Sequence, residues 1–313
     1  MRVAPPLPKA ASRGAKRINV AGKHTALSAP RQTTASASER SGGFDFARAA
    51  SQLTDAASRA GAAIMRHFRE APEIEIKSDN SPVTRADRDS EAIILEALAQ
   101  LAPDVKVVSE EACDGTIGPL PVRFFLVDPL DGTKEFIKKR SDFTVNIALI
   151  DDGAPRFGLV YAPACALLAV TPARGRAVEA ELPPNASGAD LSRLDQKVLH
   201  ARLPNKEGLT ALVSLSHLDP ETEAFLGKLK ILERSGVGSS VKFLAIAKGE
   251  ADVYPRFAPT MEWDTAAGQA VLEAAGGAVL DTNGAPLRYG KTELGLRNPS
   301  FIAWGLKDAS DRR

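Results

Sequence analysis

Apolar side chains recur at three- and four-residue spacing in two segments of the first hundred residues. The first segment runs from Phe46 to Phe68, and Pro72 prevents it from continuing as a helix. The second begins near Thr84, which can cap it together with Asp87 three positions later. The spacing therefore predicts two amphipathic helices that each bury one face.

Short runs rich in β-branched and aromatic residues follow the second helical segment. They predict strands over residues 105–109, 123–127, 143–150, 157–161 and 166–170. Residues 174–197 are polar and contain Pro183-Pro184, so we expect a surface connection or a domain junction there. Two helices followed by a series of strands favour an α+β layer over a repeating βαβ chain.

The rest of the chain has the pattern of a second α/β portion. It predicts a strand over 212–215, helices near 221–229, near 239–247 and after Asp264, and a strand over 278–280 preceded by Gly276-Gly277. We therefore expect a disordered basic tail over residues 1–43 and two closely packed portions with a cleft between them. Their expected ranges are 44–190 for the N-terminal α+β portion and 191–313 for the C-terminal α/β portion.

Composition supports a globular body behind a basic tail. Of the 313 residues, 44% are hydrophobic and 25% are charged, which is typical of a soluble globular protein. Residues 1–40 hold eight of the 40 basic side chains and one of the 39 acidic ones, which leaves the rest of the chain mildly acidic. An acidic body gives no electrostatic footprint for nucleic acid, so we expect no nucleic-acid partner.

The tail is nearly free of large apolar side chains and cannot offset its ordering entropy by burial. Its Arg- and Ser-rich composition is similar to that of an organelle transit peptide, but no clear amphipathic helix runs through it. A dispensable extension is the favoured interpretation. Organelle targeting by the tail remains an alternative.

Two cysteines, Cys113 and Cys165, fit no disulfide framework or metal-binding spacing and indicate a reducing compartment. No apolar run approaches the roughly 20 residues of a membrane helix. The first 40 residues also lack the apolar stretch of a secretory signal. We therefore expect a cytoplasmic protein without a transmembrane segment, with peripheral association with the inner face of a membrane as an alternative. The sequence does not define an oligomeric state.

The stretch from Asp128 to Thr133, Asp-Pro-Leu-Asp-Gly-Thr, is the most informative part of the sequence. It follows an apolar strand, and ligands of α/β sheets usually bind at the carboxyl ends of strands. Pro129 forces a turn that can bring Asp131 beside Asp128, and Gly132 opens a helix whose N–H groups can cradle a phosphate. Two carboxylates there would repel each other and the phosphate unless hard divalent cations such as Mg²⁺ lay between them.

Two further acidic positions stand at similar places. Glu110-Glu111 ends the strand over 105–109, and Asp264 precedes a helix. Taken singly, a Glu pair at a strand end is usually solvated surface, and an Asp before a helix is usually its N-cap. The Asp128–Thr133 stretch differs, because a plain turn accounts for its Pro and Gly but not for two acids and a Thr.

Three of these segments together resemble the signatures of the lithium-sensitive, magnesium-dependent phosphatases of the inositol monophosphatase superfamily. They are Asp128–Thr133, Trp263–Gly268 and Ser109–Glu111, and the resemblance covers about residues 44–306. It implies the layered α-β-α-β-α sandwich of the inositol monophosphatase and fructose-1,6-bisphosphatase type. Lys134-Glu135-Phe136 is similar to the 3′(2′),5′-bisphosphate nucleotidase branch, whereas inositol monophosphatases usually have Asn-Phe in place of Glu135-Phe136.

The resemblance implies a site with two or three Mg²⁺ ions. One ion would be held by Glu110, Asp128 and the backbone carbonyl of Leu130. A second would be held by Asp128, Asp131 and Asp264. On this basis the N-terminal portion carries most of the metal ligands, and the C-terminal portion supplies the last one and the nucleotide contacts.

The same resemblance implies the catalytic groups. Thr133 would act with Glu110 to orient and deprotonate the attacking water, and Asp87 would help to organise the site and reach a third ion through water. Gly132, Thr133 and Lys134 would line the departing phosphate. No protein nucleophile is required, because two metal ions can hold both the attacking and the leaving oxygen of an in-line displacement.

The resemblance implies nucleotide contacts for His217, Ser239, Lys242 and Arg256. It implies substrate contacts also for Glu110, Leu130, Asp131 and Asp264. Lys242 and Arg256 are cations that can neutralise the second phosphate of a bisphosphate substrate, although both could be ordinary surface residues. The chain departs from the branch at Leu215, where Arg is common, and this puts the substrate preference in doubt but not the metal chemistry.

The sequence thus predicts an Mg²⁺-dependent phosphatase that converts 3′-phosphoadenosine 5′-phosphate to AMP and phosphate, a recycling step connected with sulfate assimilation. An inositol or sugar phosphate phosphatase of the same fold is the alternative enzyme, and Lys134-Glu135 argues against it. A catalytically silent nucleotide- or metal-sensing protein is the non-enzymatic alternative. It is disfavoured because every carboxylate of the constellation is present.

Overall fold

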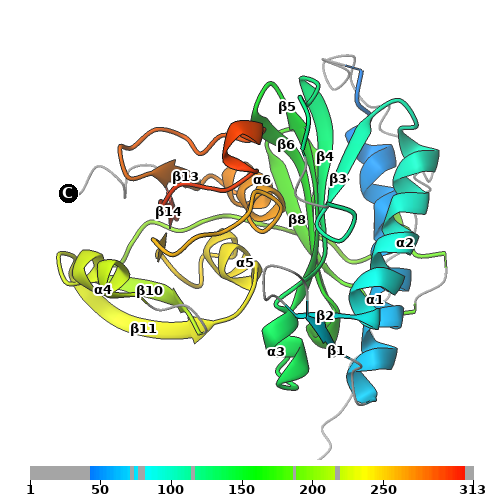
Figure 1. Ribbon diagram of the computed structural model, residues 1–313. Coiled ribbons are helices and arrows are strands. Elements are labelled where there is room, and N and C mark those ends of the chain that lie inside the picture. The colour runs from blue at the N-terminus through cyan, green and yellow to red at the C-terminus, as the bar shows by residue number, and fades with distance from the viewer. Residues whose placement is uncertain are drawn as a thin grey trace, which may run out of the picture. The chain divides into compact units, whose positions relative to one another are not determined.

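The computed structural model arranges helices and sheets in five alternating layers (Figure 1). It describes residues 43–70, 74–76, 82–113, 117–185, 188–215 and 219–306. Helices α1 (Phe46–Arg69) and α2 (Arg85–Leu101) form the first layer and a seven-stranded sheet the second. Helices α5 (Val241–Ala247) and α6 (Ala266–Ala274) form the third, a five-stranded sheet the fourth, and α4 (Pro220–Leu226) the fifth. This order confirms the expected α-β-α-β-α sandwich.

The two N-terminal helices form where the sequence pattern predicts them. Asp45 caps α1 by accepting a hydrogen bond from the Arg48 N–H. Thr84 and Asp87 form a reciprocal capping box at the start of α2, so each side chain satisfies a backbone N–H that the helix leaves unpaired. The predicted cap is therefore confirmed, and it fixes Asp87 in a buried position.

The seven-stranded sheet follows chain order from its first strand to its last. β3 and β4 are parallel, and every later neighbour is antiparallel. Its strands are β3 (Lys106–Ser109), β4 (Arg123–Asp131), β5 (Thr144–Asp151), β6 (Ala154–Ala162), β7 (Leu167–Ala173), β8 (Arg176–Glu181) and β9 (Lys197–Val198). A separate two-stranded sheet pairs β1 (Ile74–Ile76) with β2 (Pro82–Thr84). The five strands predicted before residue 174 are all present.

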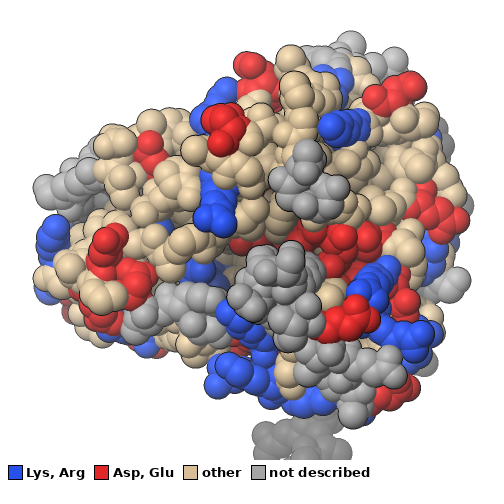
Figure 2. Space-filling view, in the orientation of Figure 1, with Lys and Arg blue, Asp and Glu red and all other residues tan. Residues whose placement is uncertain are grey.

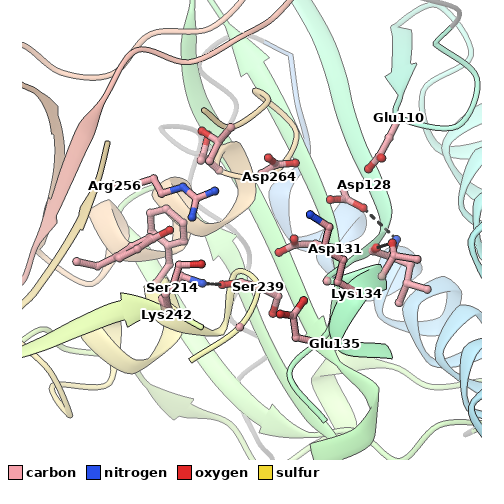
Figure 3. A pocket seen from close by; sticks show the side chains of 18 residues that line it. Glu110, Asp128, Asp131, Lys134, Glu135, Ser214, Ser239, Lys242, Arg256 and Asp264 are labelled. Atoms are coloured by element: carbon pink, nitrogen blue, oxygen red, sulfur yellow. Dashed lines mark hydrogen bonds between the residues drawn. The ribbon is translucent and has the colours of Figure 1, made fainter. Parts of the chain in front are cut away.

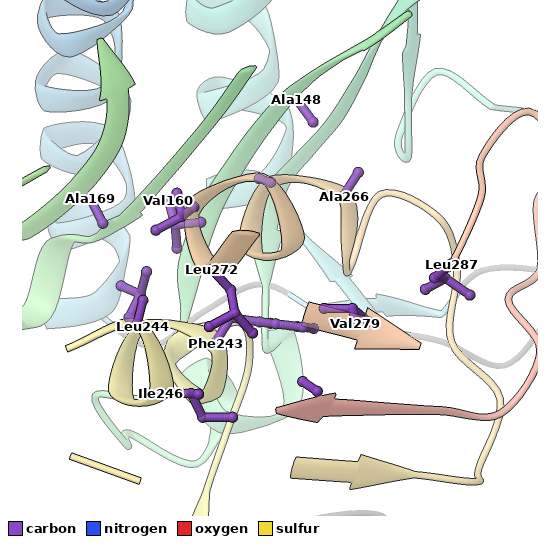
Figure 4. Close-up of a cluster of buried hydrophobic side chains, with 14 of the residues drawn as sticks. Ala148, Val160, Ala169, Phe243, Leu244, Ile246, Ala266, Leu272, Val279 and Leu287 are labelled. Atoms are coloured by element: carbon purple, nitrogen blue, oxygen red, sulfur yellow. The ribbon is translucent and has the colours of Figure 1, made fainter. Parts of the chain in front are cut away.

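Side chains of the large sheet alternate between two apolar cores because successive residues of a strand point to opposite faces. In β4, Phe125 and Val127 join the core beneath α1 and α2. Phe124 and Leu126 join the core between the two sheets, which is the one drawn in Figure 4. Burial on both faces explains why β4 is an almost continuous apolar run rather than an alternating one.

The five-stranded sheet is mixed and has the order β11-β10-β12-β14-β13. Its strands are β10 (Leu209–Ser214), β11 (Ile231–Val237), β12 (Val253–Arg256), β13 (Ala278–Asp281) and β14 (Phe301–Trp304). Its inner face meets α5 and α6, and its outer face meets α4 through a small core that includes Phe225 and Trp304. The helices predicted in this part of the chain are confirmed, with shorter bounds for the first two.

The structure corrects the expectation for residues 174–197. Instead of being only a surface connection, this segment contains β8, which pairs with β7 inside the seven-stranded sheet. Ala177 and Val178 are fully buried there, but the segment carries too few large apolar residues for its strand character to be visible in the sequence. β11 also escaped prediction, because its apolar residues stand only at its two ends and all of its residues are exposed or partly exposed.

The remaining connections include short 3₁₀ turns and one five-residue helix, α3 (Thr133–Ile137). The 3₁₀ turns are η2 (Pro163–Cys165), η3 (Leu191–Arg193) and η4 (Thr292–Leu294). Residues 1–42, nearly the whole predicted tail, lie outside the described residues. The predicted domain boundary at residue 190 stays a prediction. Among the helices of the described segments, none is both long and apolar enough to span a membrane.

Gly158 of β6 is expected to be indispensable for the approach of α6 to the large sheet. A Cβ added there would lie 2.4 Å from the Ala267 carbonyl oxygen and 2.7 Å from the Ala270 Cβ. Gly158→Ala should therefore destabilise the fold by about 1–3 kcal/mol, the usual cost of overpacking a core, measured as a lower urea midpoint. Gly118→Ala is the matched control, since an added Cβ meets nothing within 4 Å there. Equal midpoints for both variants would contradict the close approach.

Candidate active site

Three carboxylates from distant parts of the sequence meet between the two sheets. Glu110 follows β3, Asp128 lies in β4, and Asp264 lies in the loop before α6. One oxygen from each lies within 4.8 Å of one from both others. Figure 3 shows the three side chains directed toward one another, and Figure 2 shows acidic residues gathered near the centre of the visible face.

The Asp128–Thr133 stretch differs in one respect from the simple turn that its sequence predicts. β4 continues through Asp131, and the pairing with β5 shifts register between Asp128 and Asp131, so Pro129 and Leu130 form an irregularity within the strand. The Leu130 N–H donates to Asp128 Oδ1 at 3.0 Å, which fixes that carboxylate. Gly132 then starts α3 with a φ of 93°, a value that glycine adopts without strain.

Asp131 is held by one group from the large sheet and one from the start of α5. Its Oδ2 accepts a hydrogen bond of 2.6 Å from the Ser240 N–H, just before α5, and one of 3.4 Å from the Thr144 hydroxyl of β5. The Ser240 hydroxyl donates to the Asp264 carbonyl at 2.8 Å and accepts from Asn146 Nδ2 at 3.0 Å. Ser240 thus links two acidic residues that come from opposite halves of the chain.

Asp87 and Thr133 meet on the side of the site that faces α2. The Thr133 hydroxyl lies 3.3 Å from Asp87 Oδ1 and 3.1 Å from the Leu130 carbonyl oxygen, and it can donate to either. The other carboxylate oxygen of Asp87 accepts the capping hydrogen bonds from Thr84. Asp87, the helical member of the α2 capping box, therefore also orients a hydroxyl in the site.

The electrostatics of the cluster suit divalent cations. Burial, together with repulsion from neighbouring carboxylates, raises the pKa of Asp128 and of Asp264 well above the ordinary value. Burial raises the pKa of Asp131 as well, although Lys242 and the Ser240 N–H oppose that shift. Ionised acids so close together are unfavourable without positive charge between them, and an all-oxygen set is the set that Mg²⁺ prefers. The residues present therefore fit such an ion.

The opposite wall of the site carries two buried cations. Lys242 of α5 is 4% exposed and Arg256 of β12 is 7% exposed. Arg256 donates to the carbonyls of Ala258 and Pro259, and Figure 3 shows its guanidinium directed into the pocket. Lys242 donates to the Ser239 carbonyl, and burial lowers its pKa to about 8 although Asp131 favours its charged form. Acids and bases thus face each other across one pocket.

A cavity of about 250 Å³ joins the two walls. Its lining includes most of the residues that the sequence nominated, namely Glu110, Asp128, Leu130, Asp131, Gly132, Thr133, Lys134, Ser239, Lys242, Arg256 and Asp264. Asp87 stands behind Thr133 and does not line the cavity. His217 lies outside the described residues. Leu215 is not in the lining and is 42% exposed.

Sequence reasoning missed several polar residues of this cavity. Ser214, Tyr254, Thr260 and Thr265 line it as well, and Ser240 links the two walls. Ser240 follows Ser239 directly before an apolar helix, which is a weak signal that resembles any helix cap. The alternative that Asp264 is only the N-cap of α6 is wrong. The helix begins at Ala266, directly after Thr265, and the Asp264 carboxylate accepts a hydrogen bond from the Met261 N–H instead.

Comparison with known proteins gives one consistent result. The model of the inositol monophosphatase family matches residues 47–311. The chain is 44% identical, over 80% of its own length and 97% of the relative's, to the 3′(2′),5′-bisphosphate nucleotidase CysQ of Escherichia coli K12.

Solved structures agree with this result. A crystal structure of CysQ from Bacteroides thetaiotaomicron, a bacterial member of the inositol monophosphatase family, has 36% identity and a TM-score of 0.65, and the match covers 81% of this chain and 96% of that one. An inositol monophosphatase from Thermotoga maritima has 20% identity and a TM-score of 0.64, with 83% and 92% covered. At that identity the second likeness concerns the fold alone.

Proposed function

The chain belongs to the inositol monophosphatase family, and from this premise we propose that it is a metal-dependent 3′(2′),5′-bisphosphate nucleotidase. The reaction is hydrolysis of 3′-phosphoadenosine 5′-phosphate to AMP and phosphate. The observation that carries this function is the cavity itself, which places a carboxylate cluster opposite two buried cations. A substrate with two phosphates needs both walls.

Glu110, Asp128, Asp131, Asp264 and the Leu130 carbonyl would hold two Mg²⁺ ions, and a third would be reached through water by Asp87. When bound, such ions supply positive charge that offsets the charge of the phosphate and they lower the pKa of water. The Asp128 and Asp131 carboxylates are oriented in advance by the Leu130 and Ser240 N–H groups. Less reorganisation is then required when the site fills.

Thr133 and Glu110 would orient and deprotonate the attacking water. When the Thr133 hydroxyl donates to Asp87, its oxygen remains available as an acceptor for a proton of the water. Glu110 takes a proton as the water oxygen bonds to phosphorus and the bond from phosphorus to the 3′ oxygen breaks. The 3′ oxygen takes a proton from solvent as it leaves, and Glu110 then returns its own proton to solvent, which completes the balance of protons.

The two phosphates are assigned to opposite walls. The scissile 3′-phosphate lies beside the carboxylate cluster and the N–H groups that follow Gly132, with Lys134 at its edge. The 5′-phosphate faces Lys242 and Arg256. Charge complementarity supports this orientation, because the wall opposite the carboxylates contains the two cations that a retained phosphate requires.

Phosphate release from a panel of substrates tests the function. The panel contains 3′-phosphoadenosine 5′-phosphate, its 5′-phosphosulfate analogue, inositol 1-phosphate and fructose 1,6-bisphosphate, each with Mg²⁺ and with a chelator. We expect the two adenosine nucleotides to have the highest kcat/KM and all turnover to require Mg²⁺. A preference for inositol 1-phosphate would contradict the proposed substrate. Turnover in the presence of the chelator would contradict the metal requirement.

LiCl is expected to inhibit the enzyme at concentrations at which NaCl does not. This prediction follows from the family, whose members are lithium-sensitive. The physical reason is that a small cation can enter a position built from carboxylates such as Asp131 and Asp264, but brings half the charge of Mg²⁺. Initial rates at matched ionic strength measure the effect. Identical inhibition by the two salts would count against a site of this kind.

A further inference from the structure

A polar network adjoins the Asp264 loop, and its central residues, Asn298, Glu262 and Lys291, are not part of the cavity lining. It joins the loop that carries this acid, residues 258–265, to a loop more than twenty residues later in the chain, residues 286–298. We infer that Asn298, Glu262 and Lys291 are positioning residues for Asp264, and that the later loop thereby sets the metal affinity of the site. This inference rests on the proposed function and extends it to residues that do not touch the cavity.

Asn298 reaches the Asp264 loop at three points. Its Nδ2 donates to the Met261 carbonyl at 2.8 Å and to the Thr265 hydroxyl at 2.9 Å, and lies 3.2 Å from the Thr260 hydroxyl. Its backbone N–H donates to the Thr260 carbonyl. Asn298 therefore holds the loop on both sides of Asp264.

Met261 connects this network to the carboxylate itself. Its N–H donates to Asp264 Oδ2 at 2.8 Å, and its carbonyl accepts from the Asp264 N–H as well as from Asn298. Both the backbone and the side chain of Asp264 are thus set by the position of Met261. A shift of Met261 changes the direction in which the carboxylate points.

Glu262 and Lys291 fasten the two loops together. Glu262 is fully buried, and its carboxylate accepts from the Gly290 N–H at 2.7 Å and the Lys291 N–H at 2.9 Å. The Lys291 ammonium lies 2.6 Å from the same carboxylate and 3.4 Å from Asn298 Oδ1. Because the ammonium donates to Oδ1, it fixes which end of the Asn298 amide faces the Asp264 loop. A buried carboxylate that accepts from three donors in this way holds one geometry.

The position of Asp264 makes this network relevant to metal binding rather than to folding alone. Asp264 is the member of the carboxylate cluster that comes from the C-terminal part of the chain, whereas Asp128 lies in β4 and Glu110 comes directly after the last residue of β3. A loop has no ladder of hydrogen bonds to fix its backbone, so outer partners must orient the side chains it carries. The network supplies those partners.

Mn²⁺ binding to the full-length protein tests the inference directly. The binding is measured from the electron paramagnetic resonance signal of the free ion. In Asn298→Ala, the Kd for Mn²⁺ should rise about 10- to 100-fold, the usual effect of removing an outer partner of a ligand. The Mg²⁺ concentration for half-maximal turnover should rise in parallel, and excess Mg²⁺ should restore part of kcat. A Kd within twofold of wild type would overturn the inference.

Two further variants separate positioning from loss of fold stability. Glu262→Gln keeps an acceptor for one of the two backbone N–H groups and leaves the contacts of Asn298 with the Asp264 loop in place, but it loses the ion pair. We therefore expect a smaller rise in Kd in the same direction, and this variant also serves if Asn298→Ala does not fold. Arg202→Gln is the control, because it breaks the pair with the buried Asp252 in a part of the fold outside the site. It should lower the melting temperature and leave the Mn²⁺ Kd unchanged.

The outcomes for the inference and for the proposed function are distinct. If wild type binds Mn²⁺ but hydrolyses no phosphate monoester, the proposed function falls, and the Kd values of the variants still judge the positioning of Asp264. If Arg202→Gln raises the Kd as much as Asn298→Ala does, the network acts only through stability and the inference is overturned.

Discussion

Asp128→Asn is expected to lower kcat by at least about 10³-fold while the protein stays folded. The metal centre must supply several kcal/mol of charge stabilisation, and each 1.36 kcal/mol corresponds to about a tenfold change in rate. Asp128 is central to the carboxylate cluster, so neutralising it weakens both proposed ion positions. The Asn side chain can still accept the hydrogen bond that Leu130 donates, which keeps the local backbone in place.

The melting temperature gives this prediction a second, independent readout. Because the pKa of Asp128 is raised in the folded state, its contribution to stability is fully present below the unfolded pKa and is lost as pH rises through the folded pKa. At pH 7.5 in a chelator, Asp128→Asn should therefore melt no lower than wild type, and Mg²⁺ should stabilise it less. Asp151→Asn, at the far end of β5 beside Arg123, is the control. If Asp128→Asn had a kcat within a few-fold of wild type, Asp128 would not be a metal ligand of the active site.

Arg256→Ala should damage use of the bisphosphate far more than use of 3′-AMP, which has no 5′-phosphate. A hydrogen bond to a charged group contributes about 1.5–3 kcal/mol, so the selective loss in kcat/KM should be about 10- to 150-fold. The burial of Arg256 within the cavity wall keeps solvent from screening that contact. Steady-state kinetics on the two substrates give the ratio.

Two variants make the result specific. Arg256→Lys keeps the charge but loses the planar fork that its carbonyl partners hold in place, so it should recover only part of the loss. Arg234→Ala removes an arginine of β11 whose partner is the exposed Glu223, outside the cavity, and should leave both substrates unaffected. Equal losses on both substrates in Arg256→Ala would mean that this residue acts structurally or at the metal end.

Local sequence patterns were sufficient to predict the structural features that depend only on residues close together in the sequence. The apolar spacing of α1 and the capping box of Thr84 and Asp87 are decided within one or two turns of chain, and both were predicted. The Asp128–Thr133 motif was also readable, because a strand, an irregular turn and a short helix succeed one another within a few residues. Segments whose buried residues are small, such as β8, gave no comparable signal.

The sequence by itself determined the type of chemistry, since it contains the carboxylates and cations and shows the family to which they belong. Only the tertiary structure decided their arrangement. Asp264 meets Asp128 across the layer boundary because α6 can approach the large sheet at Gly158, and Ser240 joins Asp131 to Asp264 from a third segment. Periodicity reports which face of an element is buried, but it carries no information about which distant element lies against that face. The partners of Asp264, Asn298 among them, are fixed by that packing and so could be found only in the folded chain.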